Sequence, residues 1–266
     1  MLAIVVPIID PVLLHLGRLE VRWYGVTYAV GILLCCYAMI FLDRRNNARL
    51  LNMSVVDSLI LYVTLGIIFG GRVGYVLFYH PDWFLHSMIR VFKIWEGGMS
   101  FHGGLIGIAI AIYVLCRRHT LPVWQICDMF ATTVPIGLFL GRIANFINVE
   151  LCGRITDVPW GVIFPQLDNF PRHPSQIYEA MLEGVLLFVI MLVLYFKTHL
   201  KDKSGSLSGT FLIGYAIIRM IVENYRAPDQ HIGFIIAQVT LGQILSVPML
   251  LLGVYIIFSK MNKNVN

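Results

Sequence analysis

Charged residues are scarce in this chain. Only 13% of its 266 residues are Asp, Glu, Lys or Arg, whereas 58% are hydrophobic, and the mean hydropathy is +0.77. A typical soluble domain carries about 25% charged residues. The scarcity therefore excludes an ordinary soluble domain, and the composition indicates a membrane protein.

Several patterns that would indicate other classes are missing. The five cysteines show no CxxC or metal-ligand spacing, so neither a metal nor another cofactor is expected. Basic residues interleaved with aromatic ones are absent, so the net charge of +5 does not indicate nucleic-acid binding. The apolar segment 1–16 lacks a basic start and is not expected to be a cleaved signal peptide. We expect it to form an interfacial helix or a cap on the outer side.

Long apolar runs are what the chain has instead. About seven of them approach the ~20 residues that a helix needs to cross a bilayer. They cover residues 24–42, 57–79, 98–116, 125–148, 177–196, 208–225 and 237–258. We therefore expect an all-α, polytopic integral membrane protein with about seven transmembrane helices.

No repeat, low-complexity segment or linker divides these runs, which predicts a single transmembrane domain over residues 1–266. Between the fourth and fifth runs, residues 149–176 are rich in proline and glycine. We expect turns and a short hairpin there, forming a small external lobe. Glycines at four-residue spacing in the second and third runs predict close helix packing: Gly66, Gly70, Gly74, Gly103 and Gly107.

Basic residues are distributed unevenly between the two sides of such a protein. Ten of the 20 lysines and arginines lie on one side: Arg44, Arg45, Arg49, Arg117, Arg118, Lys197, Lys201, Lys203, Lys260 and Lys263. Seven lie on the other: Arg18, Arg22, Arg90, Lys93, Arg154, Arg172 and Arg226. The positive-inside rule then places the N-terminus outside and the C-terminus in the cytoplasm.

Strongly polar side chains interrupt two of the runs at helical spacing. Arg142, Asn145 and Asn148 recur at i, i+3 and i+6, which places them on one helical face. The alternative is that the helix ends near Gly141 and these residues form a solvated interfacial loop. An ionisable side chain in hydrocarbon is costly unless it is paired or faces water, so it indicates a functional site.

The sixth run repeats this pattern. Tyr215, Arg219 and Glu223 recur at i, i+4 and i+8, and Arg226 follows three residues later. One explanation is an internal ion pair, with Glu223 neutralising Arg219 or Arg226. Counting Arg72, Arg142 and Arg219 against Glu223 still leaves excess positive charge within the membrane.

These polar residues share one depth. With a rise of about 1.5 Å per residue in a hydrocarbon core about 30 Å thick, they all fall in its outer half. They are Tyr24, Arg72, His102, Arg142, Arg219 and Glu223. The shared depth predicts a polar cavity that opens to the outer leaflet. Guanidinium groups suit a phosphate, and the anion at this depth is a phospholipid headgroup.

Other polar residues are weaker candidates. A lone histidine near an interface, such as His102, is often only a hydrogen-bonded structural group. Arg154, Arg172 and His173 lie in the external lobe. The RHPS stretch at 172–175 fits the start of a helix as well as a site, with Pro174 at the beginning of the fifth run. Asp57 and Asp128 lie at expected cytoplasmic helix starts, where they are expected to interact with the helix dipoles rather than to belong to a site.

Six sequence blocks together resemble the bacterial prolipoprotein diacylglyceryl transferases. The most specific is GRIANFINVELCGR at 141–154, close to the family pattern GRxGNFxNxExxG. The others are RWYG at 22–25, GGRVGYVLFY at 70–79, GGMSFHGGLIG at 97–107, RHPSQIYE at 172–179 and GYAIIRMIVENYRAPD at 214–229. The departures are Arg22, Ala144, Val149 and Cys152, and none removes a charged or hydrogen-bonding residue of the motif.

The resemblance implies a transferase of the bacterial cytoplasmic (inner) membrane. Its implied partners are phosphatidylglycerol, prolipoprotein signal peptides with a lipobox cysteine, and membrane lipids. The enzyme would transfer the diacylglyceryl group of phosphatidylglycerol to the cysteine thiol, the first step of bacterial lipoprotein maturation. His102 is then the candidate base, Tyr24 an orienting hydroxyl, and Arg142 and Arg219 catalytic groups on the phosphate. The implied lipid-binding residues are Arg142, Asn145, Glu150, Gly153, Arg219, Glu223, Arg72, Tyr215 and Arg226.

Two other classes remain open from the residues alone. A transporter or lipid flippase with an anion site near the outer leaflet would also place arginines in glycine-interrupted spans. The chain shows no twofold internal similarity and an odd number of runs, which disfavours that class. A non-catalytic assembly subunit would not need several buried arginines.

Overall fold

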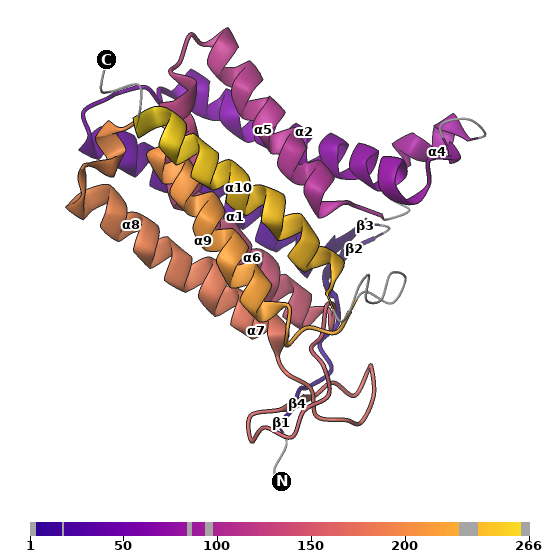
Figure 1. The fold of residues 1–266 in the computed structure, drawn as a ribbon. Coiled ribbons are helices and arrows are strands. Elements are labelled where there is room, and N and C mark those ends of the chain that lie inside the picture. The colour runs from indigo at the N-terminus through magenta and orange to yellow at the C-terminus, as the bar shows by residue number, and fades with distance from the viewer. Residues whose placement is uncertain (1–3, 18, 84–86, 94–97, 229–238, 262–266) are drawn as a thin grey trace. The chain divides into compact units, whose positions relative to one another are not determined.

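Helices dominate the computed structural model, which describes residues 4–17, 19–83, 87–93, 98–228 and 239–261 (Figure 1). Each predicted apolar run contains a helix or a helical segment. These are α1 (Trp23–Arg45), α2 (Met53–Tyr79), α5 (Phe101–Arg118), α6 (Val123–Ile147), the segment Ser175–Lys197, α9 (Ser206–Val222) and α10 (Leu241–Met261). The prediction of an all-α, polytopic membrane protein is confirmed.

Five of these helices are long and apolar enough to cross a membrane: Trp23–Arg45, Met53–Leu77, Val123–Ile147, Ser175–Lys197 and Leu241–Ser259. The helices at the third and sixth runs, α5 and α9, have 18 and 17 residues. The count of seven spans therefore stays a prediction. α6 continues through Arg142 and Asn145 to Ile147, so the alternative of a helix that ends near Gly141 is wrong.

The fifth run changes its helical geometry along its length. It begins as α7 (Ser175–Glu179), continues as the π-helix η2 (Ala180–Leu186) and returns to α-helical geometry in α8 (Leu187–Lys197). A short 3₁₀ helix, η3 (His199–Asp202), follows. π-Helical segments are rare in proteins, and those that do occur are frequently found at functional sites.

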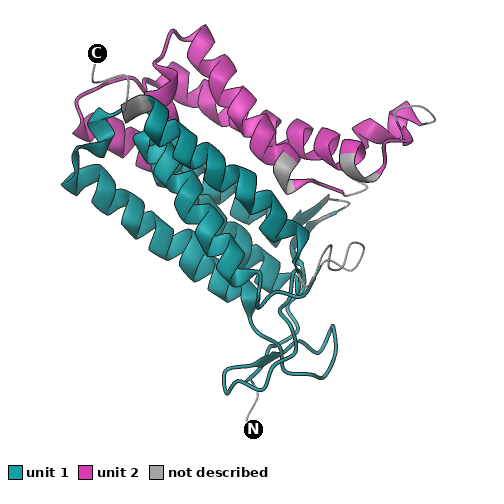
Figure 2. Ribbon diagram, viewed as in Figure 1, with its two compact units in different colours: residues 1–35, 128–266 teal, residues 36–127 magenta. Residues whose placement is uncertain are grey.

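The chain forms two compact units, coloured separately in Figure 2. Residues 36–127 make up one unit, in which α2 packs along α5 and the short helix α4 (Met88–Phe92) follows α2. Residues 1–35 and 128–266 make up the other, in which α9 packs along α10 and against the fifth run. The single transmembrane domain over residues 1–266 stays a prediction.

Glycines bring α2 and α5 into backbone contact, as their spacing predicts. A Cβ atom added to Gly107 would lie 2.0 Å from the carbonyl oxygen of Gly66 and 3.0 Å from the Cα of Gly70. Neither contact is with a flexible side chain that can move away. Without Cβ atoms the two backbones approach closely, and this packing holds the helices together.

Replacing Gly107 by alanine is therefore expected to destabilise the protein. Overpacking of this kind costs about 1–3 kcal/mol, which exceeds the gain of roughly 0.5–1 kcal/mol in helix propensity. Gly104→Ala is the matched control, because its Cβ would only make an ordinary contact at 3.9 Å with the carbonyl oxygen of Ile67. The two variants are compared by their thermal unfolding midpoints in detergent, and the midpoint of Gly107→Ala is expected to be the lower one. Equal midpoints for the two would show that α2 and α5 do not pack through Gly107.

Side chains cap several helix starts in the described residues. The Asn52 side chain accepts a hydrogen bond from the backbone N–H of Val55 at the start of α2. Thr240 and Gln243 form a reciprocal pair at the start of α10, in which each side chain accepts from the other residue's backbone N–H. This is the capping-box arrangement, and it fixes where α10 begins beside the end of α9.

Asp128 stabilises the start of a helix other than its own. Its carboxylate lies in α6, is nearly buried, and accepts hydrogen bonds from the backbone N–H groups of Gly205 and Ser208 and from the Ser208 hydroxyl. These groups lie at the start of α9. The sequence placed Asp128 at the start of its own helix, but α6 begins at Val123 and has no acidic residue in its first turn. Asp128 instead interacts with the N-terminal end of α9.

The N-terminal segment is extended, so the expectation of an interfacial helix there is wrong. Residues Ile4–Val5 form β1, Val12–Leu16 form β2 and Leu19–Arg22 form β3. β2 and β3 pair as an antiparallel hairpin, and β1 pairs in parallel with β4 (Val162–Ile163) in the external lobe. The partner strand β4 lies more than a hundred residues along the chain, and pairing with it satisfies the backbone of β1.

The external lobe has its own small core. Val6 packs there with Cys152, Val162 and Phe164, and Phe146 and Val149 cover its side. Isolated antiparallel bridges join Ile155 to Arg172 and Val162 to Arg172. The hairpin expected in 149–176 is thus present only as isolated bridges among the described residues.

Candidate functional site

A network of three arginines and three glutamates lies within the unit formed by residues 1–35 and 128–266. Its members come from α6, from the α7–η2 junction, and from the end of α9 and the residues that follow: Arg142, Glu179, Glu183, Arg219, Glu223 and Arg226. Three segments distant in sequence therefore meet at one polar cluster.

Arg142 connects α6 with both glutamates of the fifth run. Its Nε and Nη2 atoms donate to Oε2 of Glu183 at 3.2 and 2.9 Å. Its Nη1 atom lies 3.1 Å from Oε2 of Glu179. Two hydrogen bonds from one guanidinium edge to one carboxylate fix the orientation of the arginine side chain.

Arg219 makes the corresponding contacts from α9. Its Nη1 atom donates to Oε1 of Glu179 at 2.5 Å and lies 3.6 Å from Oε1 of Glu183. Its Nη2 atom lies 2.7 Å from Oε2 of Glu223. The ion pair between Arg219 and Glu223 that the four-residue spacing allows is therefore present.

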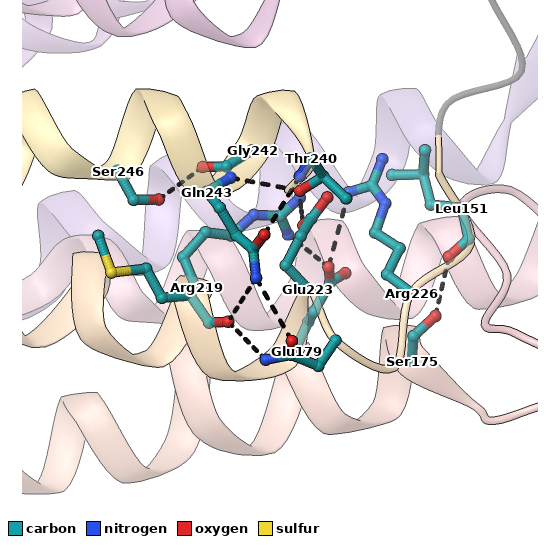
Figure 3. Close-up of polar contacts among 12 residues, drawn as sticks. Leu151, Ser175, Glu179, Arg219, Glu223, Arg226, Thr240, Gly242, Gln243 and Ser246 are labelled. Atoms are coloured by element: carbon teal, nitrogen blue, oxygen red, sulfur yellow. Dashed lines mark hydrogen bonds and ion pairs between the residues drawn. The ribbon is translucent and has the colours of Figure 1, made fainter. Parts of the chain in front are cut away.

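Figure 3 shows Glu179, Arg219, Glu223 and Arg226 directed toward one another. Arg226 approaches the same carboxylate as Arg219, with its Nη1 atom 3.7 Å from Oε1 of Glu179. Glu179 thus contacts all three arginines and lies at the centre of the network.

The pairing corrects the charge count made from the sequence. That count set arginines against Glu223 alone and left out Glu179 and Glu183, so the expectation of uncompensated arginines at Arg142 and Arg219 is wrong. The Glu179 and Glu183 side chains are 0% exposed, and those of Arg142 and Arg219 are 12% and 11% exposed. Full burial of two carboxylates requires the neighbouring positive charges, because desolvation strongly disfavours an unpaired ion.

A signal for both missed residues was available in the sequence. Glu179 and Glu183 lie four residues apart inside an apolar run, and each is an ionisable side chain in a segment predicted to span the membrane. The criterion that selected Arg142 selects them equally. Their pairing with α6 and α9 was not readable, because it depends on how three distant helices pack.

A chain of hydrogen bonds extends from the end of α6 into the external lobe. The Asn145 side chain donates from Nδ2 to Oε2 of Glu150 at 3.1 Å, and the backbone N–H of Glu150 donates to the carbonyl of Asn145 at 2.8 Å. The buried Gln176 amide donates to the carbonyl of Glu150 and to the Cys152 thiol. These contacts join the motif after Arg142 to the start of the fifth run.

Cys152 and Gly153 complete this connection. Burial raises the pKa of the Cys152 thiol above its ordinary value, which favours the protonated thiol. Gly153 forms an antiparallel bridge with Arg226, so the predicted motif is held beside the residues that follow α9.

Two tyrosines approach the arginine network. Tyr215 is buried in α9 and interacts electrostatically with Arg142, Arg219 and Glu183. Tyr24, at the start of α1, has its hydroxyl 3.3 Å from that of Tyr28 and interacts electrostatically with Glu150 and Arg142. The structure therefore brings together nine of the predicted residues: Tyr24, Arg142, Asn145, Glu150, Gly153, Tyr215, Arg219, Glu223 and Arg226.

The remaining two predicted residues lie in the other unit. Arg72 is 2% exposed and donates to the backbone carbonyls of Arg90, Val91 and Gly98, with its guanidinium 5.5 Å from the centre of the Trp83 ring. These contacts hold the segment that follows α2. His102 lies in the first turn of α5, and its side chain lies outside the described part of the structure.

The polar side chains of the external lobe hold the lobe together. Arg172 pairs with Asp168 and donates to the carbonyl of Gly153, and its guanidinium lowers the pKa of the Asp168 carboxyl. His173 shares a hydrogen bond with the Tyr178 hydroxyl, and burial lowers its pKa, which favours the neutral imidazole. Arg154 donates to the carbonyl of Arg226.

Comparison with known proteins gives one consistent match. The family model for prolipoprotein diacylglyceryl transferase matches residues 11–259. Phosphatidylglycerol–prolipoprotein diacylglyceryl transferase of Rickettsia akari is 49% identical over 252 residues, covering 94% of this chain and 96% of that protein. The protein of the same name from Rhodospirillum rubrum is 47% identical, covering 94% of this chain and 92% of that protein. The one from the Wolbachia of Drosophila simulans is 44% identical, covering 97% of this chain and 97% of that protein. With a match that spans nearly its whole length, this chain belongs to the prolipoprotein diacylglyceryl transferase family.

Proposed function

We propose that this chain transfers the diacylglyceryl group of phosphatidylglycerol to the thiol of the lipobox cysteine in prolipoproteins. The similarity to transferases of that name over residues 11–259 carries the proposal. The helices that are long and apolar enough to cross a membrane fit a lipid substrate. The same family membership supports a place in the bacterial cytoplasmic membrane.

The reaction is an alkylation. The cysteine sulfur forms a bond to the glycerol carbon of the diacylglyceryl group, and the bond from that carbon to the phosphate oxygen breaks. The thiol loses its proton, and glycerol phosphate leaves with the bonding electron pair. The reaction requires a thiolate, in-line placement, and positive charge beside the departing phosphate.

The roles proposed from the sequence fit these requirements. Arg142 and Arg219 supply the positive charge for the phosphate, and Asn145 and Glu150 order the headgroup region. Tyr24 orients the lipid, and His102 accepts the thiol proton. The partial exposure of Arg142 and Arg219, beside carboxylates that are fully buried, supports their assignment to the phosphate.

A direct assay tests the function. Purified protein is incubated with phosphatidylglycerol and a synthetic lipobox peptide, and products are separated by mass spectrometry. A thioether-linked diacylglyceryl peptide together with released glycerol phosphate is the expected result. A lipid flippase or an assembly subunit would yield neither product, and absence of both would refute the proposal.

The orientation of the chain is a further part of the proposal. A reporter fused after Lys260 is expected to be active only in the cytoplasm, and one inserted in residues 149–176 only outside. The reason is the excess of basic residues on the loops of the C-terminal side, which anchors those loops in the cytoplasm. Reporter activities with the opposite pattern would place the arginine network toward the inner leaflet and contradict the proposed topology.

A further inference from the structure

We infer that Glu179 and Glu183 are positioning residues of the transfer reaction. Their buried carboxylates fix the orientation of the Arg142 and Arg219 side chains and partly neutralise the positive charge that these arginines present to the lipid phosphate. The inference rests on the proposed function. It concerns two residues that neither the motif resemblance nor the names of the relatives assign to a role.

Burial places the carboxylates behind the arginines. Both glutamate side chains are 0% exposed, whereas the side chains of Arg142 and Arg219 are 12% and 11% exposed. A guanidinium carries five N–H groups. The hydrogen bonds of Arg142 to Glu183 engage one N–H group on Nε and one on Nη2. Its Nη1 lies 3.1 Å from Oε2 of Glu179 as an ion pair, so N–H groups remain for another acceptor. A phosphate oxygen that accepts from these remaining N–H groups fits that requirement.

The network carries no net charge within its six members. The positive charges of Arg142, Arg219 and Arg226 equal the negative charges of Glu179, Glu183 and Glu223. A phosphodiester headgroup adds one negative charge, and the departing phosphate gains more as its bond to carbon breaks. The buried carboxylates therefore weaken the attraction for the lipid while they fix the arginines in the geometry that the reaction needs.

Local backbone structure explains how Glu183 reaches α6. The π-helix η2 contains Glu183 and Gly184, and a Cβ added to Gly184 would lie 2.6 Å from the Cβ and 2.9 Å from the Cα of Phe139. Only glycine permits this close approach between η2 and α6. Phe139 lies three residues, nearly one helical turn, before Arg142, so the close approach sets Glu183 beside the Arg142 guanidinium.

Two substitutions of Glu183 separate positioning from charge. Glu183→Gln keeps the side-chain length and removes the negative charge, whereas Glu183→Asp keeps the charge and shortens the side chain. Glu183→Asp is expected to lower kcat by about tenfold or more, because it draws the carboxylate away from Arg142 and misplacement of a catalytic group by about 1 Å can cost up to about 100-fold. Only Glu183→Gln is expected to lower the KM for phosphatidylglycerol, since one opposing charge is gone. When the chemical step is slow, KM approaches the dissociation constant of the lipid. The difference in KM between the two Glu183 variants therefore reports a difference in affinity for phosphatidylglycerol.

The measurements are initial rates of thioether formation against phosphatidylglycerol in mixed micelles, and bound phosphatidylglycerol by native mass spectrometry. If Glu183→Asp keeps the kcat of the parent, the positioning role is refuted. If neither the KM nor the bound lipid of Glu183→Gln changes in the expected direction, the charge role is refuted. A parent chain that forms no thioether at all would instead refute the proposed function, while the bound-lipid measurement still tests the charge role.

Gly184→Ala tests the positioning role if the Glu183 variants do not fold. It moves η2 away from α6 without changing any charge, so kcat is expected to fall and lipid affinity is not expected to rise. Gly214→Ala is the matched control, because its Cβ would meet only the Cδ1 atom of the Leu187 side chain, at 2.9 Å. Equal kcat values in the two alanine variants would contradict the positioning role.

Discussion

Arg142→Lys is expected to lower transfer by about 100-fold although the positive charge is kept, a loss similar to that for removing one preorganised donor from an active site. The structure gives the reason. Arg142 uses Nε and Nη2 on one oxygen of Glu183 and Nη1 on Glu179. A lysine ammonium is a single point of charge and does not reproduce this planar set of contacts. The rate of thioether formation at saturating phosphatidylglycerol measures the effect.

Arg117→Lys is the control for the substitution itself. Arg117 is exposed in the last turn of α5. Its replacement is expected to leave transfer unchanged, since exposed charges in water contribute little to stability. Both variants are compared at equal amounts of folded protein. Near-normal turnover in Arg142→Lys would reduce Arg142 to a general counter-charge and would refute its proposed contact with the phosphate.

Helix positions were largely readable from the sequence because the bilayer imposes a length on apolar runs. The fourth run was predicted at 125–148, and α6 spans Val123–Ile147. The second was predicted at 57–79, and α2 begins earlier, at Met53, because the Asn52 side chain caps it. Capping contacts thus move helix ends by a few residues beyond what hydropathy indicates.

The N-terminal strands show where this reading fails. Segment 1–16 is apolar, and it was interpreted as an interfacial helix or a cap on the outer side. β1 instead pairs with β4 at Ile4 and Val162, and Val6 is buried against Phe164 in the lobe core. Pairing with a distant strand and burial in a distant core leave no local periodicity to detect.

The network of arginines and glutamates was also predictable only in part. Its members from α6 and α9 were predicted because each forms a stripe at helical spacing. The depth estimate, which placed Arg142, Arg219 and Glu223 at a common level, agrees with their convergence within one unit. The pairing partners were not predicted, because Glu183 meets Arg142 only through the close approach of η2 and α6 at Gly184. Local spacing therefore identifies which residues belong to a polar cluster, and tertiary packing decides which charges neutralise one another.

His102→Gln is expected to slow transfer by about 10² to 10⁴, the usual contribution of a general base. A free thiol has a pKa of about 8.5, so only a few per cent is thiolate at neutral pH. An imidazole that accepts the proton during attack removes this limitation. Glutamine keeps the approximate size and some hydrogen bonding of histidine but does not act as a base. Binding of phosphatidylglycerol, measured by native mass spectrometry, is expected to be normal in this variant.

The pH dependence of the rate distinguishes a base from a structural group. If His102 is the base, raising the pH from about 6 to about 9 recovers part of the lost rate in His102→Gln, because the thiol ionises without help as the pH passes its pKa. His199→Gln is the control, since His199 is exposed in η3 and its substitution is expected to change neither the rate nor its pH dependence. Loss of lipid binding in His102→Gln would make His102 a headgroup or structural ligand. Full transfer by His102→Gln at every pH in that range would show that His102 is not the base. Another residue or water would then accept the thiol proton.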